Sequence, residues 1–381
     1  LAEQKKIQLS HVKVDRSEIV EMGDFDLEGL FVRLGHAIDS IGARRVVLDP
    51  IEVLFGAFTN RAILRSELQR LFRWLKEKGV TAIVTVEAGE NTLTRHGIEE
   101  YVSDCVIFLD NQVVNQSAIR LLRVVKYRGT NHGTNEYPFL ITEDGISLLP
   151  ITSLGLDYKV PTERISTGID RLDTMMGGEG YFRASSILVS GQSGTGKTSV
   201  AALFVDAACR RGERSLIFCF EESAEQLLRN MRSIGLDLTP WIKNGRLKIQ
   251  TLRPWSYGLE QHLVNMIKII EDFKPRYVVI DPISSFLSLG TGLEIKTMLC
   301  SLIDYLKMNQ ITGLLTDLSS GDKIHETTTS DVSSLIDTWI GLINIENQGE
   351  RNRGLYIVKS RGMAHANQLR EFFLTDHGVD L

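Results

Sequence analysis

The sequence predicts an α/β fold in two tandem copies, with a mostly parallel central sheet and antiparallel hairpins at the C-terminal end. The first observation is a set of short apolar runs that alternate with helical patterns. The runs are 186–190, 215–220, 277–281 and 313–317, and the helical patterns include 199–211 and 294–308. Alternation of this kind predicts parallel strands covered by helices on both faces. The second is the close-spaced set 338–346, 355–359 and 371–375, which is typical of antiparallel hairpins.

The third observation is an internal duplication. RVVLDP at 45–50 recurs as YVVIDP at 277–282, and VKYRG at 125–129 recurs as VKSRG at 358–362. Two more collinear segments end in glycines, at Gly145 and Gly378. Matches at nearly one offset predict two copies of one domain.

The predicted domains are 1–155, the C-terminal part of a first copy, and 156–381, a complete second copy. The join lies near 150–164, a stretch with two prolines and no sustained periodicity. Residues 191–198 of the second copy form a glycine-rich loop. The offset between the copies places the matching loop of the first copy before residue 1. We therefore expect the chain to begin partway through its first domain, and a natural chain with a degraded first half is the alternative.

Composition excludes several classes of protein. The net charge of −5 weighs against a broad nucleic-acid surface, and no apolar run approaches the about 18–20 residues of a membrane helix. The four cysteines lie far apart without a CxxC pair, which argues against a disulfide framework or a zinc site. This usage predicts a protein of the reducing cytoplasm.

Residues 191–198 read GQSGTGKT and match the phosphate-binding pattern GxxxxGK[ST], between an apolar strand and a helical run. Backbone N–H groups of such a loop point at phosphate oxygens, a lysine contacts the β- and γ-phosphates, and a hydroxyl ligates Mg²⁺. The motif therefore predicts Mg·ATP as the ligand. The predicted contact residues are Gly191, Ser193, Gly194, Thr195, Gly196, Lys197 and Thr198.

Four acidic residues lie at or just after the ends of predicted strands. Asp281 ends the run 277–281, where an acid can hold Mg²⁺ through a water, and Asp49 occupies the same place in the first copy. Glu221 and Glu222 follow the run 215–220, so they would lie at the carboxyl edge of the sheet beside the γ-phosphate. There one of them could orient or deprotonate an attacking oxygen. The residues alone leave a second interpretation open, in which both acids sit at the N-terminus of the next helix.

Two further segments carry candidate residues. Lys126 and Arg128, repeated as Lys359 and Arg361, sit near strand ends, where cations could reach the γ-phosphate of a neighbouring subunit. A solvated strand edge guarded by cations is the alternative. The segment 321–334 is rich in hydroxyls and carries three acids against one lysine, so it would repel a DNA backbone. It would be a mobile surface loop or a phosphoryl acceptor.

Taken together, these residues resemble the KaiC family, the RecA-like double-domain ATPases of the cyanobacterial clock and their bacterial and archaeal relatives. The resemblance covers essentially the whole chain and implies tandem RecA-like P-loop NTPase domains. It implies a general base at Glu221, with Glu222 as its partner and as a metal-site residue beside Thr198 and Asp281. It also implies that Lys359 and Arg361 reach across a subunit interface.

The resemblance assigns acceptors and first-copy contacts as well. Ser333 and Ser334 fall on the family's adjacent phosphoacceptors, and Thr328 falls on an accessory threonine. The second acceptor is serine here, where the family has threonine. In the first copy, the positions that match contacts to a neighbour's nucleotide are Lys126, Arg128, Thr130 and His132. The family's C-terminal tail, with its KaiA-docking segment, has no counterpart before Leu381.

The implied function is an ATP-hydrolysing homo-hexamer that phosphorylates its own serine or threonine hydroxyls, with ATP and Mg²⁺ as cofactors. Kai-type clock or signalling proteins would be its partners, without membrane or nucleic acid. One alternative is a KaiC-like ATPase that acts as a signalling scaffold without autokinase activity. A RecA- or RadA-type DNA-handling ATPase is the other, and the acidic segment 321–334 speaks against it.

Overall fold

The computed structural model describes most of the chain, and it divides into two compact units. The described residues are 6–11, 28–55, 61–89, 92–95, 97–114, 117–143, 145–148, 159–319, 332–347, 350–375 and 378–381. One unit comprises 1–108 with 123–135, and the other comprises 109–122 with 136–381. The predicted domain boundary at 155–156 falls outside the described residues, so it stays a prediction.

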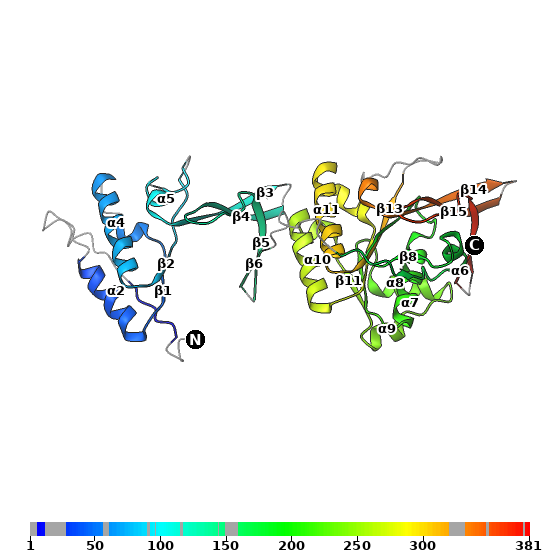
Figure 1. The fold of residues 1–381 in the computed structure, drawn as a ribbon, viewed down its shortest axis with the longest axis horizontal. Coiled ribbons are helices and arrows are strands. Elements are labelled where there is room, and N and C mark those ends of the chain that lie inside the picture. The colour runs from blue at the N-terminus through cyan, green and yellow to red at the C-terminus, as the bar shows by residue number, and fades with distance from the viewer. Residues whose placement is uncertain are drawn as a thin grey trace. The chain divides into compact units, whose positions relative to one another are not determined.

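The first unit packs two helices against a short parallel strand pair (Figure 1). Its elements are α2 (Glu28–Ile41), β1 (Arg45–Leu48), α3 (Glu52–Phe55), α4 (Arg61–Glu77), β2 (Thr81–Val84) and α5 (Glu99–Val102). The α4 residues Leu64, Leu68 and Leu71 recur at helical spacing and are fully buried. The ring of Phe31 from α2 stacks on Trp74 at 5.2 Å between centroids.

A four-stranded sheet follows, in the order β3-β4-β5-β6. Its strands are β3 (Cys105–Val114), β4 (Ser117–Tyr127), β5 (Glu136–Thr142) and β6 (Gly145–Leu148). Residues 109–114 of β3 and 117–122 of β4 belong to the second unit, as do β5 and β6. The hairpin β5–β6 pairs antiparallel from Phe139↔Leu148 to Thr142↔Gly145.

The second unit is built on a mixed sheet, which has nine strands among the described residues, in the order β11-β10-β12-β13-β9-β14-β15-β16-β17. The strands are β9 (Ser186–Gly191), β10 (Ser215–Cys219), β11 (Leu247–Thr251), β12 (Tyr277–Asp281), β13 (Thr312–Leu318), β14 (Thr338–Asn347), β15 (Glu350–Ser360), β16 (Arg370–Thr375) and β17 (Gly378–Asp380). Neighbours from β11 to β14 are parallel, and those from β14 to β17 are antiparallel. The α/β class predicted from the sequence is confirmed.

Helices cover both faces of this sheet. The principal helices are α7 (Lys197–Arg210), α8 (Ala224–Arg232), α10 (Leu259–Phe273) and α11 (Gly292–Met308). Residues of α7 and α8 share one buried cluster with Ile187 and Val189 of β9, whereas α10 and α11 share the other with Leu188. Successive side chains of a strand point to opposite faces, so β9 contributes to both cores.

Short elements complete the second unit. They are β7 (Arg164–Ile165), α6 (Asp170–Met175), β8 (Tyr181–Phe182), α9 (Thr239–Lys243) and the 3₁₀ turns η2 (Pro254–Ser256), η3 (Ile283–Ser288) and η4 (Ser333–Leu335). Among the described residues, no helix is both long enough and apolar enough to cross a membrane.

Each of the two VKxRG segments makes the same backbone contacts in its own surroundings. The Lys and Arg side chains each donate to a backbone carbonyl, and the two carbonyls belong to consecutive residues. The pairs are Lys359 with Ser333, Arg361 with Ser334, Lys126 with Glu100, and Arg128 with Tyr101. Donor and acceptor positions both recur 233 residues apart, so the sequence repeat has a matching repeat of hydrogen bonds.

Candidate nucleotide-binding site

The glycine-rich loop joins the buried strand β9 to helix α7, which begins at Lys197. Gly194 and Gly196 have φ values of 78° and 97°, a left-handed conformation that favours glycine. A Cβ at Gly191 would lie 2.5 Å from the carbonyl oxygen of Leu342, so only glycine fits there. The backbone therefore has the tight curl that phosphate binding requires, at the N-terminus of a long helix.

The Lys197 ammonium lies inside this curl. Its Nζ donates to the carbonyl oxygens of Gly191, at 2.9 Å, and Gln192, at 2.8 Å. The side chain is only 8% exposed, and this burial lowers the pKa of Lys197, although the nearby carboxylates of Asp281 and Glu221 oppose that shift. An ammonium has three donors, so the two loop bonds hold it in place and leave one for a phosphate oxygen.

Thr198 and Asp281 form a corner suited to a hard cation. The Thr198 hydroxyl donates to Asp281 Oδ2 at 2.8 Å, and the hydroxyl of Thr316 on β13 donates to the other carboxylate oxygen. The described residues hold no cluster of three or more His, Cys, Asp or Glu side chains suited to a metal. Mg²⁺ usually takes one or two protein oxygens and completes its shell with water and phosphate. The donor set therefore fits Mg²⁺ bound together with a nucleotide.

Glu221 and Glu222 precede helix α8 instead of opening it. The N-cap is Ser223, which forms a capping box with Gln226, and the acid of the first turn is Glu225. Both acids lie directly before the N-cap, so the alternative interpretation, that they serve the helix N-terminus, stays open. β10 pairs in parallel with β12, with Cys219 beside Asp281, so the acids emerge at the same sheet edge as Asp281.

The two glutamates have different partners. Glu221 is exposed, its Oε1 accepts a hydrogen bond from Ser285 at 3.2 Å, and its backbone carbonyl accepts one from Arg253 at 3.2 Å. Glu222 is half-buried, and its Oε2 accepts from the side-chain amide of Asn230 at 3.1 Å. Glu221 is thus the more accessible carboxylate.

Strands of the C-terminal hairpins brace the loop, which the sequence did not reveal. Arg353 on β15 donates to the Gly194 carbonyl at 3.1 Å, and Asn344 on β14 donates to the Gln192 side chain at 2.7 Å. The ring of Phe372 on β16 packs so close to Gly196 that a Cβ there would lie 2.7 Å from it. The sequence signal for the two hydrogen bonds was a polar residue in each of the strands β14 and β15.

The predicted acceptors lie at the opposite end of the parallel strands from the loop 191–198. β14 runs parallel to β9, with Thr338 beside Ile187 at its start and Leu342 beside Gly191 where the loop begins. Ser333 and Ser334 precede β14, so at least roughly 13 Å of strand separates them from their own loop. Lys359 and Arg361 lie at this same end of the strands, opposite the loop. Thr328 lies outside the described residues.

The first-copy candidates lie at the end of β4 and in the residues that follow it. Lys126 is half-buried, and burial together with the charge of Arg128 lowers the pKa of Lys126. Lys359 shows the same direction, since burial and Arg361 lower its pKa. Thr130 is exposed and His132 half-buried in the turn that follows β4.

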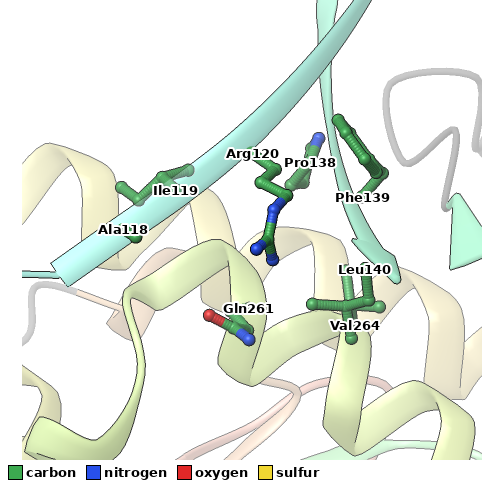
Figure 2. A pocket seen from close by; sticks show the side chains of 8 residues that line it. All are labelled: Ala118, Ile119, Arg120, Pro138, Phe139, Leu140, Gln261 and Val264. Carbon is green, nitrogen blue, oxygen red and sulfur yellow. The ribbon is translucent and has the colours of Figure 1, made fainter. Parts of the chain in front are cut away.

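A small pocket in the second unit is unrelated to this site. Figure 2 shows it between strand residues, among them Ile119, Arg120 and Phe139, and the helix α10 residues Gln261 and Val264. Its lining includes none of the phosphate-loop or acidic residues described above. The nucleotide-site hypothesis does not involve it.

A phosphate-binding loop on a mostly parallel sheet, with strand-end acids at the same edge, defines a P-loop NTPase of the RecA-like class. The model of one ATPase family, KaiC, matches residues 1–153 and 165–381. The chain belongs to the KaiC family of ATPases.

Curated relatives share this membership. The chain is 54% identical to circadian clock protein KaiC2 of Synechocystis sp., over 100% of the chain and 67% of that relative. It is 38% identical to the circadian clock oscillator protein KaiC of Synechococcus elongatus, over 94% of the chain and 70% of that protein. With circadian clock protein KaiC3 of Synechocystis sp. the figures are 37%, 94% and 72%.

Proposed function

We propose that this protein binds and hydrolyses Mg·ATP at the loop 191–198 and transfers phosphate to its own Ser333 or Ser334. The observation that carries the proposal is the convergence of Lys197, the Thr198–Asp281 pair and Glu221 on one sheet edge. Family membership supports the ATPase part. The autokinase part rests on the acceptor hydroxyls and on the similarity to the family.

In this proposal each loop residue has a distinct task. Backbone N–H groups from Ser193 to Lys197 hold phosphate oxygens, and the Lys197 ammonium offsets their charge. Thr198 and Asp281 hold Mg²⁺, and Glu222 is the third residue of the proposed metal site. The bound Mg²⁺ would supply a positive charge that stabilises the negative charge developing on the departing ADP.

Glu221 acts as the general base. Its carboxylate is exposed at the loop edge, and one of its oxygens accepts from Ser285, which leaves the other for a water or a serine hydroxyl. As the water or serine oxygen bonds to the γ-phosphorus, its proton passes to the Glu221 carboxylate, the bond from the γ-phosphorus to the bridging oxygen breaks, and ADP leaves. Ser285 restricts the rotation of the side chain and so keeps the base oriented.

Phosphoryl transfer passes between two copies of the chain. The acceptor turn η4 and the loop 191–198 belong to opposite ends of β9 and β14, which supports transfer to a serine of another copy. A neighbouring copy would bring its acceptor edge, with Lys359 and Arg361, to the phosphate. A homo-hexameric ring satisfies this need with one repeated heterologous interface.

The same logic applies to the first copy and to the cellular role. We propose residues 1–155 and 156–381 as the two RecA-like domains, with Lys126, Arg128, Thr130 and His132 facing a neighbour's nucleotide. Relatives named as circadian clock proteins support a clock or signalling partner. The four free cysteines support a reducing, cytoplasmic location.

The second candidate is an ATPase that signals through its nucleotide state without phosphorylating itself. The serine at position 334, where the family pattern has threonine, favours it. Intact-mass spectrometry after incubation with Mg·ATP separates the two. Gains of about 80 Da per phosphate, lost in a Ser333→Ala/Ser334→Ala variant, support the autokinase. ATP consumption without a mass gain supports the second candidate.

A further inference from the structure

His262 is a buried polar side chain to which the nucleotide site assigns no task. It lies on α10, is 0% exposed, and makes edge-to-face contacts with three rings. The centroid distances are 5.9 Å to Phe220, 5.5 Å to Tyr257 and 5.6 Å to Phe286. An aromatic cage of this kind would accept a phenylalanine equally well, so the polarity of His262 calls for a reason.

That reason lies in one hydrogen bond. His262 Nε2 is 2.7 Å from the carbonyl oxygen of Pro254, and a carbonyl only accepts, so Nε2 carries the proton. Nδ1 is then an acceptor, and it is buried without a partner. Burial also lowers the pKa of His262, which keeps the ring neutral. The hydrogen bond to the Pro254 carbonyl offsets the free-energy cost of burying Nδ1 without a partner.

The groups that His262 touches surround Glu221. Phe220 is the residue immediately before Glu221, and its backbone N–H donates to the Asp281 carbonyl at 3.0 Å. Pro254 follows Arg253, whose guanidinium donates to the Glu221 carbonyl. Phe286 follows Ser285, whose hydroxyl donates to the Glu221 carboxylate. The three segments that position Glu221 therefore all contact the imidazole ring of His262.

We propose that His262 is a positioning residue for Glu221, acting through its Nε2–H bond to Pro254. This inference rests on the proposed function, in which Glu221 is the base. Loss of the hydrogen bond frees the turn η2, so Arg253 no longer fixes the Glu221 carbonyl. Small displacements of a base reduce the rate of the chemical step while substrate binding is unaffected.

Two variants of the full chain separate the hydrogen bond from the ring. His262→Phe keeps the aromatic packing and loses the donor, whereas His262→Gln keeps an N–H donor at a similar reach and loses the ring. We expect kcat for ATP hydrolysis to fall about tenfold or more in His262→Phe, with KM within about twofold of wild type. We expect His262→Gln to retain kcat within about threefold. The reverse order would mean that His262 only fills space, and would overturn the proposal.

A double variant tests whether His262 acts through Glu221. Adding His262→Phe to Glu221→Gln should lower kcat no further, because the positioned group is already gone. A further tenfold loss overturns the proposal. Normal turnover of Glu221→Gln would refute the proposed base itself. Slow Glu221→Gln with wild-type turnover of His262→Phe would refute only the inference. If His262→Phe does not fold, a tenfold loss of kcat in folded His262→Gln overturns it.

Discussion

The Thr198 hydroxyl donates a 2.8 Å hydrogen bond to the Asp281 carboxylate, although 83 positions separate the two residues in the sequence. This bond joins the first turn of α7 to the end of β12 and so brings the phosphate loop to the strand-end acid. Glu221 emerges from the strand next to β12. The residues proposed as phosphate contacts, cation ligands and base are thus all positioned by strands β9, β10 and β12 of one sheet.

Lys197→Ala should abolish measurable nucleotide binding at this site. The ammonium stabilises both the curl of the loop, through Gly191 and Gln192, and the phosphate charge. Titration with a fluorescent ATP analogue checks this, with Lys243→Ala in helix α9 as a control that removes a lysine outside the loop. An affinity equal to that of the wild type would show that the loop 191–198 does not bind the nucleotide.

Glu221→Gln should leave ATP affinity within about threefold and reduce turnover by about 10²–10⁴-fold, because the amide cannot take the proton of the attacking oxygen. Phosphate release under saturating ATP measures the rate. Glu225→Gln is the matched control, since it removes an acid from the first turn of α8 without touching the site. Equal rates in wild type and Glu221→Gln would place the base elsewhere.

Thr316→Val should weaken Mg²⁺-dependent ATP binding by about 1 kcal/mol, or roughly fivefold. The substitution conserves shape but removes the hydroxyl that orients Asp281. Thr316→Ser keeps the hydroxyl and should restore binding. Calorimetry at several Mg²⁺ concentrations distinguishes the cases, and a valine variant with wild-type Mg²⁺ dependence would show that Thr316 is structural only.

His262 should make the folded state less stable at acid pH. Burial lowers its pKa below the ordinary 6.5, so between the folded pKa and 6.5 the unfolded chain binds a proton that the folded chain does not. The free energy of unfolding therefore falls as pH drops through this window, by at most about 1.4 kcal/mol per pH unit. Urea unfolding at pH 7.5 and 5.5 measures it. His262→Gln should lose less stability than wild type, and identical losses would contradict the assignment.

The sequence predicted the parallel sheet well because its signals are local. The loop 191–198 and the apolar runs of β9, β12 and β13 lie within short windows, and α7 follows the glycines directly. Strand ends were less accurate, since the prediction 355–359 covers only part of β15. The first residues of that strand, 350–353, are all polar in the sequence, so they lack the apolar alternation that predicts a strand.

Long-range contacts were out of reach for the opposite reason. The bond of Asn344 to Gln192 and that of Arg353 to Gly194 span more than 150 positions and exist only because β14 pairs with β9. Sequence spacing contains no information on strand order. The separation of Ser333 and Ser334 from their own loop likewise follows from β9 and β14 being parallel.

The central claim is that phosphate from one chain's nucleotide reaches Ser333 or Ser334 of another. Glu221→Gln chains keep the acceptors but lose the base, whereas Ser333→Ala/Ser334→Ala chains keep the base but lose the acceptors. Intact-mass spectrometry after incubation with Mg·ATP follows each variant alone and in a mixture. The account predicts gains of about 80 Da on the Glu221→Gln chains in the mixture only. No gain in the mixture, or an equal gain on Glu221→Gln alone, would contradict it.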